Sequence, residues 1–177
     1  MFIGGVLLSL LSLMVVYHAI FFCVGIVRQK YFPEELIKKF ETYHSEEVGT
    51  ALPKTGNPDS GCGRFSQEMD YGAWVGFNNW QRVQMNFYES LTAVVIFMFV
   101  SGVAYADYAT YLGIGYVVGR IIYSVGYTYG ATYRVVGALI LDVCVLALIV
   151  MSFFSVANMD FNNKVVLNSS STKVSYT

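Results

Sequence analysis

The stretch RVQMNFYESLTAVVIFMFVSGVAYA, residues 82–106, decides how this chain folds. After Arg82 its only charged side chain is Glu89, and the remainder is apolar or uncharged. A helix needs about 20 mostly apolar residues to cross the hydrocarbon core of a bilayer, so residues 83–106 are predicted to span a membrane. Three further stretches have the same character and are also predicted to span: residues 1–27, 108–133 and 135–159.

The composition supports the same class. Of 177 residues, 55% are hydrophobic and 13% are charged, whereas a soluble domain carries about 25% charged residues. The formal net charge of −1 offers no basic surface for nucleic acid, so no nucleic-acid partner is expected. The three cysteines are far apart and form no CxxC motif, so neither a disulfide framework nor a metal site is predicted. We predict an all-α membrane protein built as a bundle of four transmembrane helices.

Two polar segments flank the predicted spans. Residues 28–82 form a long loop in which residues 33–47 have the spacing of an amphipathic helix, and residues 160–177 form a polar tail. The long loop holds most of the eleven basic residues, which places it on the cytosolic side by the positive-inside rule.

Ionisable residues inside the spans follow helical spacing. Arg82, Asn86 and Glu89 lie at i, i+4 and i+7, on one face of the second span. A second polar face, on the third span, comprises Tyr116, Arg120, Tyr123 and Tyr127, with Arg134 close to the same line. These residues alone support two interpretations: a buried structural ion pair between Glu89 and Arg120, or a ligand site.

Other residues in the spans are assigned structural roles. Four glycines on the third span are expected to allow close helix packing: Gly115, Gly119, Gly126 and Gly130. His18 is expected to form an interhelical hydrogen bond rather than to bind a metal. Asp142 is expected to pair with a basic group or to hydrogen-bond across the bundle.

The two polar faces carry a family resemblance. Residues 82–89 have the pattern R-x-Q-x-N-x-x-E. Residues 120–127 have the pattern R-x-x-Y-x-x-x-Y, followed by Arg134 seven residues later. This combination resembles the MAPEG family, membrane-associated proteins in eicosanoid and glutathione metabolism, and most of all its microsomal glutathione transferase and leukotriene C synthase branch.

The resemblance implies a left-handed four-helix bundle that assembles as a homotrimer in the endoplasmic reticulum or mitochondrial membrane. It also implies a glutathione transferase or peroxidase that uses glutathione as co-substrate, without a metal, against a lipophilic electrophile or lipid hydroperoxide. By position, the residues that would bind glutathione are Arg82, Gln84, Asn86, Glu89, Arg120, Tyr123 and Tyr127. Arg134 would stabilise the thiolate. The alternative that the family also offers is a non-catalytic structural or lipid-binding subunit of a larger membrane complex.

The implied roles suit the chemistry of glutathione. A guanidinium group near a thiol favours the nucleophilic thiolate, and arginines bind carboxylates through paired hydrogen bonds. Glu89 is suited to the ammonium group of the tripeptide. Three features depart from the family pattern: Ser90-Leu91-Thr92 after the glutamate, the long first loop in which Arg28 is the best match to a family arginine, and Asp142.

Overall fold

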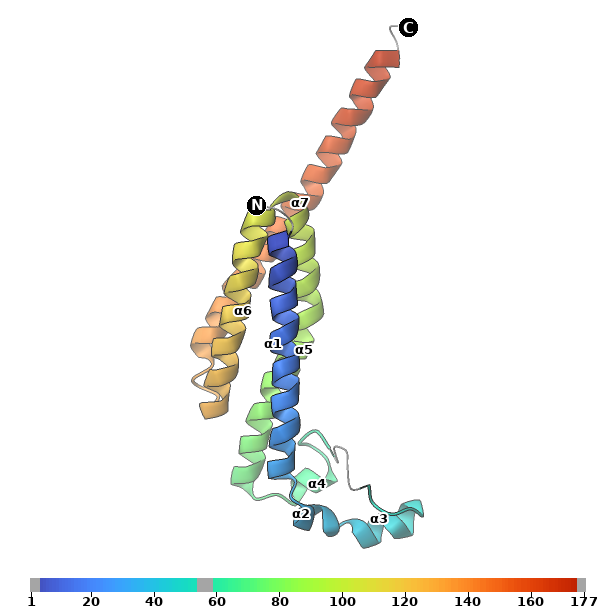
Figure 1. The fold of residues 1–177 in the computed structure, drawn as a ribbon, viewed down its shortest axis with the longest axis vertical. Coiled ribbons are helices and arrows are strands. Elements are labelled where there is room, and N and C mark those ends of the chain that lie inside the picture. The colour runs from blue at the N-terminus through green and yellow to red at the C-terminus, as the bar shows by residue number, and fades with distance from the viewer. Residues whose placement is uncertain (1–3, 54–58, 175–177) are drawn as a thin grey trace.

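The computed structural model describes the backbone of residues 4–53 and 59–174, and side chains as far as residue 159. Every element within these residues is a helix, and the four long ones form the bundle in Figure 1. The long helices are α1 (Gly4–Tyr31), α5 (Tyr71–Ala104), α6 (Ala106–Tyr129) and α7 (Val135–Val174). The short helices are α2 (Glu34–Lys38), α3 (Glu41–Val48) and α4 (Arg64–Gln67).

Among the residues that the structure describes, three helices are long and apolar enough to cross a membrane: α1, α5 and the Val135–Met159 part of α7. Their outward faces are apolar, with Leu8, Phe22 and Phe153 each more than 60% exposed. Side chains of this kind are stable on a lipid-facing surface and unfavourable in water. The chain is therefore an integral membrane protein. Helix α6, which is the predicted third span, carries Asp107 and Arg120 and is not among the three.

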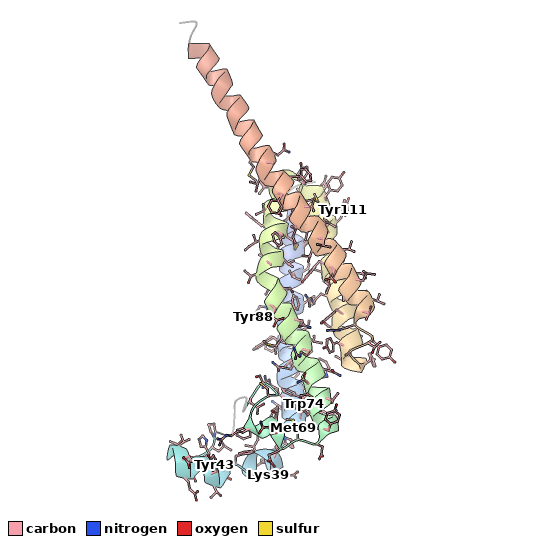
Figure 2. The ribbon with its side chains drawn as sticks, turned by 180° about the vertical axis from the view of Figure 1, so that it is seen from behind. Lys39, Tyr43, Met69, Trp74, Tyr88 and Tyr111 are labelled. Atoms are coloured by element: carbon pink, nitrogen blue, oxygen red, sulfur yellow. The ribbon has the colours of Figure 1, made fainter. Side chains whose placement is uncertain are left out.

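Helices α5 and α6 form the central pair of the bundle. Helices α5 and α6 contact each other, and each of them also contacts α1 and α7. Helix α1 lies in front of the α5–α6 pair in Figure 1, and α7 lies in front of it in Figure 2, which shows the opposite side. Helices α1 and α7 therefore cover opposite faces of the central pair.

Small and hydroxyl side chains join the helices of the bundle. Between α7 and α5, the Ser152 hydroxyl donates to the Phe97 carbonyl at 3.1 Å, and the Ser155 hydroxyl donates to the Val100 carbonyl at 2.7 Å. In a membrane, helix association depends on such close packing and hydrogen bonding, because lipid is as apolar as the helix surfaces.

Glycines set the spacing between α6 and α7. A Cβ atom added to Gly119 would lie 2.8 Å from Ile140, and one added to Gly115 would lie 3.0 Å from the Cys144 sulfur. On α7, a Cβ added to Gly137 would collide with the backbone of Tyr123. The close packing expected around Gly115 and Gly119 is present, and Gly137 makes an equivalent contact from the facing helix.

The described parts of the long loop form a small apolar unit around Phe77 at one end of α1 and α5, from which α3 extends to the side (Figure 1). Helix α5 begins at Tyr71, ahead of the expected start at residue 83, because its first turns bury Phe77 against Phe32 and Leu36. Residues 33–47, expected as one amphipathic helix, form α2 and α3 with a break that brings the Phe40 ring 4.3 Å from the Phe65 ring. Residues 160–174, expected as a polar tail, continue α7.

Arg28 anchors this unit to the bundle. Its guanidinium donates to the Asp59 carbonyl at 2.6 Å and to the Gln81 side chain at 3.0 Å. The Asp59 carboxylate in turn accepts the backbone N–H groups of Gly61 at 2.8 Å and Ser66 at 3.0 Å. Arg28, the best match to a family loop arginine, is therefore held within the loop in this chain.

The contact at Gly137 yields a first prediction. Gly137→Ala forces α7 away from the Tyr123 backbone, and we expect a loss of about 1–3 kcal/mol in the free energy of unfolding. Gly25→Ala is the matched control, because no atom lies within 4 Å of its added Cβ and alanine favours helix by about 1 kcal/mol. Thermal unfolding in detergent, followed by circular dichroism, measures both. Equal stability of the two variants would contradict the tight α6–α7 contact.

Candidate functional site

The Tyr123 hydroxyl joins three segments of the chain. It accepts a hydrogen bond from the Asn86 side-chain amide on α5, and another at 3.3 Å from the guanidinium of Arg134, just before α7. Tyr123 itself is buried on α6. One phenol oxygen therefore fixes the relative positions of α5, α6 and the connection into α7.

Arg120 lies on α6 three residues before Tyr123, about one helical turn away. Its guanidinium is 3% exposed and donates to the Ser90 hydroxyl at 2.7 Å and to the Tyr116 hydroxyl at 2.6 Å. Three aromatic rings surround it: the Phe87, Tyr116 and Tyr123 ring centres lie 4.5, 5.4 and 5.3 Å from the guanidinium carbon. The electron-rich faces of these rings stabilise the buried charge.

The ion pair considered from the sequence is not present. Among the described side chains, Glu89 makes no salt bridge to Arg120, and it lies exposed on α5. Hydroxyl groups and aromatic rings take the place of the carboxylate. The interpretation of Glu89 and Arg120 as a buried structural pair within one chain is therefore wrong.

Arg134 owes its position to the turn between α6 and α7. In this turn the Tyr133 N–H donates to the Gly130 carbonyl at 3.0 Å, and Gly126 leaves room for the Tyr133 carbonyl against α6. The Arg134 guanidinium lies 4.9 Å from the centre of the Tyr127 ring. The hydrogen bond to Tyr123 raises the pKa of Arg134, so this guanidinium is cationic across the physiological pH range.

The predicted site residues fall into two groups. The structure brings together the residues that hydrogen bonds and ring contacts join around Tyr123: Asn86, Arg120, Tyr123, Tyr127 and Arg134. Arg82, Gln84 and Glu89 form no hydrogen bond or ion pair with the described part of the chain. Arg82 and Glu89 are exposed on α5, whereas Asn86 is half-buried.

Ser90 and Phe87 complete the cluster and were not among the predicted site residues. A signal was present for Ser90, which lies four residues after Asn86 and therefore on the same side of the helix. Tyr116, one turn before Arg120, was recognised as part of the polar face but not as a partner of the arginine. Phe87 carries no polar signal and reads as an ordinary core residue.

The fold and this cluster define a class: a small helical-bundle membrane protein whose arginine and tyrosine side chains meet between helices. The model of the MAPEG family matches residues 5–154, and the chain belongs to that family. No curated protein matches the chain at a significant level.

The Tyr123 junction yields a second prediction. Tyr123→Phe keeps the ring but removes both hydrogen bonds, and we expect it to lower the free energy of unfolding by about 1–2 kcal/mol. Tyr129→Phe, on the same helix but 79% exposed, should change it by less than about 0.5 kcal/mol. Thermal unfolding of both variants in detergent tests this. Indistinguishable unfolding would show that the hydroxyl does not join the helices.

Proposed function

We propose that this protein is a glutathione transferase or peroxidase of the membrane, in which Arg134 stabilises the glutathione thiolate. The observation that carries the proposal is the setting of the Arg134 guanidinium, which the Tyr123 hydroxyl and the Tyr127 ring hold at the end of the α6–α7 turn. MAPEG membership supports it, because the family includes glutathione transferases alongside other members.

The reaction follows from the charge at this position. A free thiol has a pKa of about 8.5 and is mostly protonated at neutral pH. A fixed guanidinium stabilises the anion and so lowers the pKa of the thiol. The thiolate then forms a C–S bond with an electrophilic carbon and displaces its leaving group. With a hydroperoxide it attacks the terminal oxygen, the O–O bond breaks to release the alcohol, and a second glutathione converts the resulting sulfenic acid to the disulfide. Lipophilic substrates of either kind reach the site from the bilayer.

The remaining predicted residues fit a site shared between copies of the chain. Gln84 lies two positions from both Arg82 and Asn86, which turns it about 160–200° away around α5. Residues that point in opposite directions serve one kind of site only when the site lies between neighbouring copies. The proposal therefore includes self-association, as the homotrimer that the family resemblance implies, with α6 as the fourth span of a left-handed bundle.

In the proposed complex, each charged side chain binds the part of glutathione that carries the opposite charge. Arg82 is exposed and binds a carboxylate of the tripeptide, and the exposed Glu89 binds its ammonium group. Asn86, Tyr123 and Tyr127 line the thiol end beside Arg134. Arg120 is a positioning residue. Its buried guanidinium donates hydrogen bonds to the Ser90 and Tyr116 hydroxyls and packs against the Tyr123 ring.

Arg134→Ala is the direct test. We expect turnover to fall about 100-fold or more, as when one anion-stabilising donor is removed, with little change in the KM for glutathione. Glutathione binding by calorimetry, and thiolate absorbance in the ultraviolet, are measured on the same detergent-purified samples. Arg64→Ala is the control, because Arg64 lies in the loop and contacts Tyr43. Equal loss of binding and turnover would contradict the activating role.

The same experiment separates the enzyme from the second candidate. A wild-type protein that binds no glutathione at millimolar concentration is not a transferase. The non-catalytic structural or lipid-binding role would then be the better account of the family fold.

The pH dependence of the rate gives a further prediction. Arg134 stays cationic, so the titrating group is the thiol, and its lowered pKa makes the wild-type rate nearly constant above neutral pH. Without the guanidinium the thiol returns toward a pKa of about 8.5, and the rate of Arg134→Ala should rise about tenfold per pH unit below that value. Steady-state rates measured between pH 6 and 9, a range of about three decades in proton concentration, give this pH dependence. Parallel profiles for the two proteins would rule out thiolate stabilisation by Arg134.

A further inference from the structure

Asp142 is a carboxylate on the outward face of an apolar helix. It lies seven residues after Val135, about 10 Å along α7 from the start of the span, and it is exposed. Its exposed neighbours on α7 are Leu139, Val143 and Leu146. Within the described part of the chain it has no hydrogen bond or ion pair. An ionisable group in this position is unfavourable against lipid and calls for a partner from outside the chain.

His18 occupies a corresponding position on α1. It is exposed among apolar side chains that include Val15 and Phe22. Its Nδ1 lies 2.9 Å from the Met14 carbonyl, a contact within its own helix. The expected interhelical bond is therefore not made within the described part of the chain, where Nε2 has no partner.

The two side chains lie at about the same depth in the bundle. The ring of Tyr17, next to His18, is 5.5 Å from the ring of Phe87. Leu141, next to Asp142, packs against Gly119, the neighbour of Arg120. Because Arg120 lies over the Phe87 ring, both residues are within about one helical turn of the same layer.

The two side chains also lie on opposite sides of the molecule. His18 is on α1 and Asp142 is on α7, and these helices cover opposite faces of the α5–α6 pair, as Figures 1 and 2 show. A closed ring of identical subunits brings one flank of each copy against the other flank of the next. Equal depth is what such a ring requires of two contacting residues.

We propose that Asp142 of one copy pairs with His18 of the neighbouring copy inside the membrane. Either the protonated Nε2–H donates to the carboxylate, or the neutral carboxyl O–H donates to Nε2. The pair is neutral overall in both forms, which removes an isolated charge from the lipid. The inference rests on the self-association included in the proposed function, but not on glutathione binding.

Other exposed ionisable residues fit Asp142 less well. Glu89 lies close to the same layer but has the same sign of charge. Arg82 lies seven residues before Glu89 on α5, about 10 Å nearer the loop end. His18 combines the matching depth with a group that can donate or accept a proton.

Disulfide cross-linking in native membranes tests the contact. The full chain, with Cys23, Cys62 and Cys144 replaced by serine, carries His18→Cys together with Asp142→Cys. Mild oxidation should give covalent dimers and trimers on a non-reducing gel. The control carries His18→Cys with Phe154→Cys, exposed on α7 but about 18 Å further along the helix, and should stay monomeric. Equal cross-linking of the two pairs would overturn the proposal.

Variants that remove or exchange the two ionisable side chains provide a second test. Asp142→Leu and His18→Leu should each raise the monomer fraction in detergent several-fold, and the double variant His18→Asp with Asp142→His should restore the oligomer. An oligomer unaffected by Asp142→Leu would mean that Asp142 faces lipid, which contradicts the contact.

Native mass spectrometry gives the copy number and calorimetry gives glutathione binding. If the protein is an oligomer and binds glutathione but does not form this cross-link, the Asp142–His18 contact is refuted and the proposed function is not.

Discussion

A positive charge buried between α5 and α6 is the constraint on which the rest of this structure depends. Arg120 is 3% exposed, and its guanidinium needs both hydrogen-bond acceptors and electron-rich neighbours to be stable there. Ser90 and Phe87 supply these from α5, and Tyr116 and Tyr123 supply them from its own helix. These contacts with both helices fix how α5 and α6 align along their length, although the buried Nε of Arg120 has no hydrogen-bond partner among the described residues.

Once α5 and α6 are aligned, the position of Arg134 follows. Gly119 and Gly137 let α7 approach α6 closely, and the short turn before α7 returns the chain beside Tyr123 and Tyr127. The Tyr123 hydroxyl then receives hydrogen bonds from both α5 and Arg134. The cation proposed to stabilise the thiolate is therefore held by packing between helices rather than by a flexible loop, as pre-organised electrostatic stabilisation requires.

Family membership and the membrane class were predictable because few charges occur in the spans and those few sit at helical spacing. The grouping of Asn86, Tyr123 and Arg134 was also implied by the sequence motifs. The partners of Arg120 were harder to predict, because periodicity places residues on a face but does not say which carboxylate or hydroxyl on the next helix meets them. The folded loop was missed because Arg28 and Asp59 are far apart in sequence, and their contact depends on tertiary structure.

The residues that make no hydrogen bond or ion pair to another helix in the described part of the chain follow a pattern of their own. Arg82 and Glu89 on α5, His18 on α1 and Asp142 on α7 are polar or charged, exposed, and carried by helices long and apolar enough to span a membrane. A single copy in lipid would leave several of these groups poorly solvated at once, which is unfavourable. In the proposed assembly, contact between copies covers such faces, so the residues that bear the family motif on α5 would also favour self-association. Site formation and assembly are then one physical requirement.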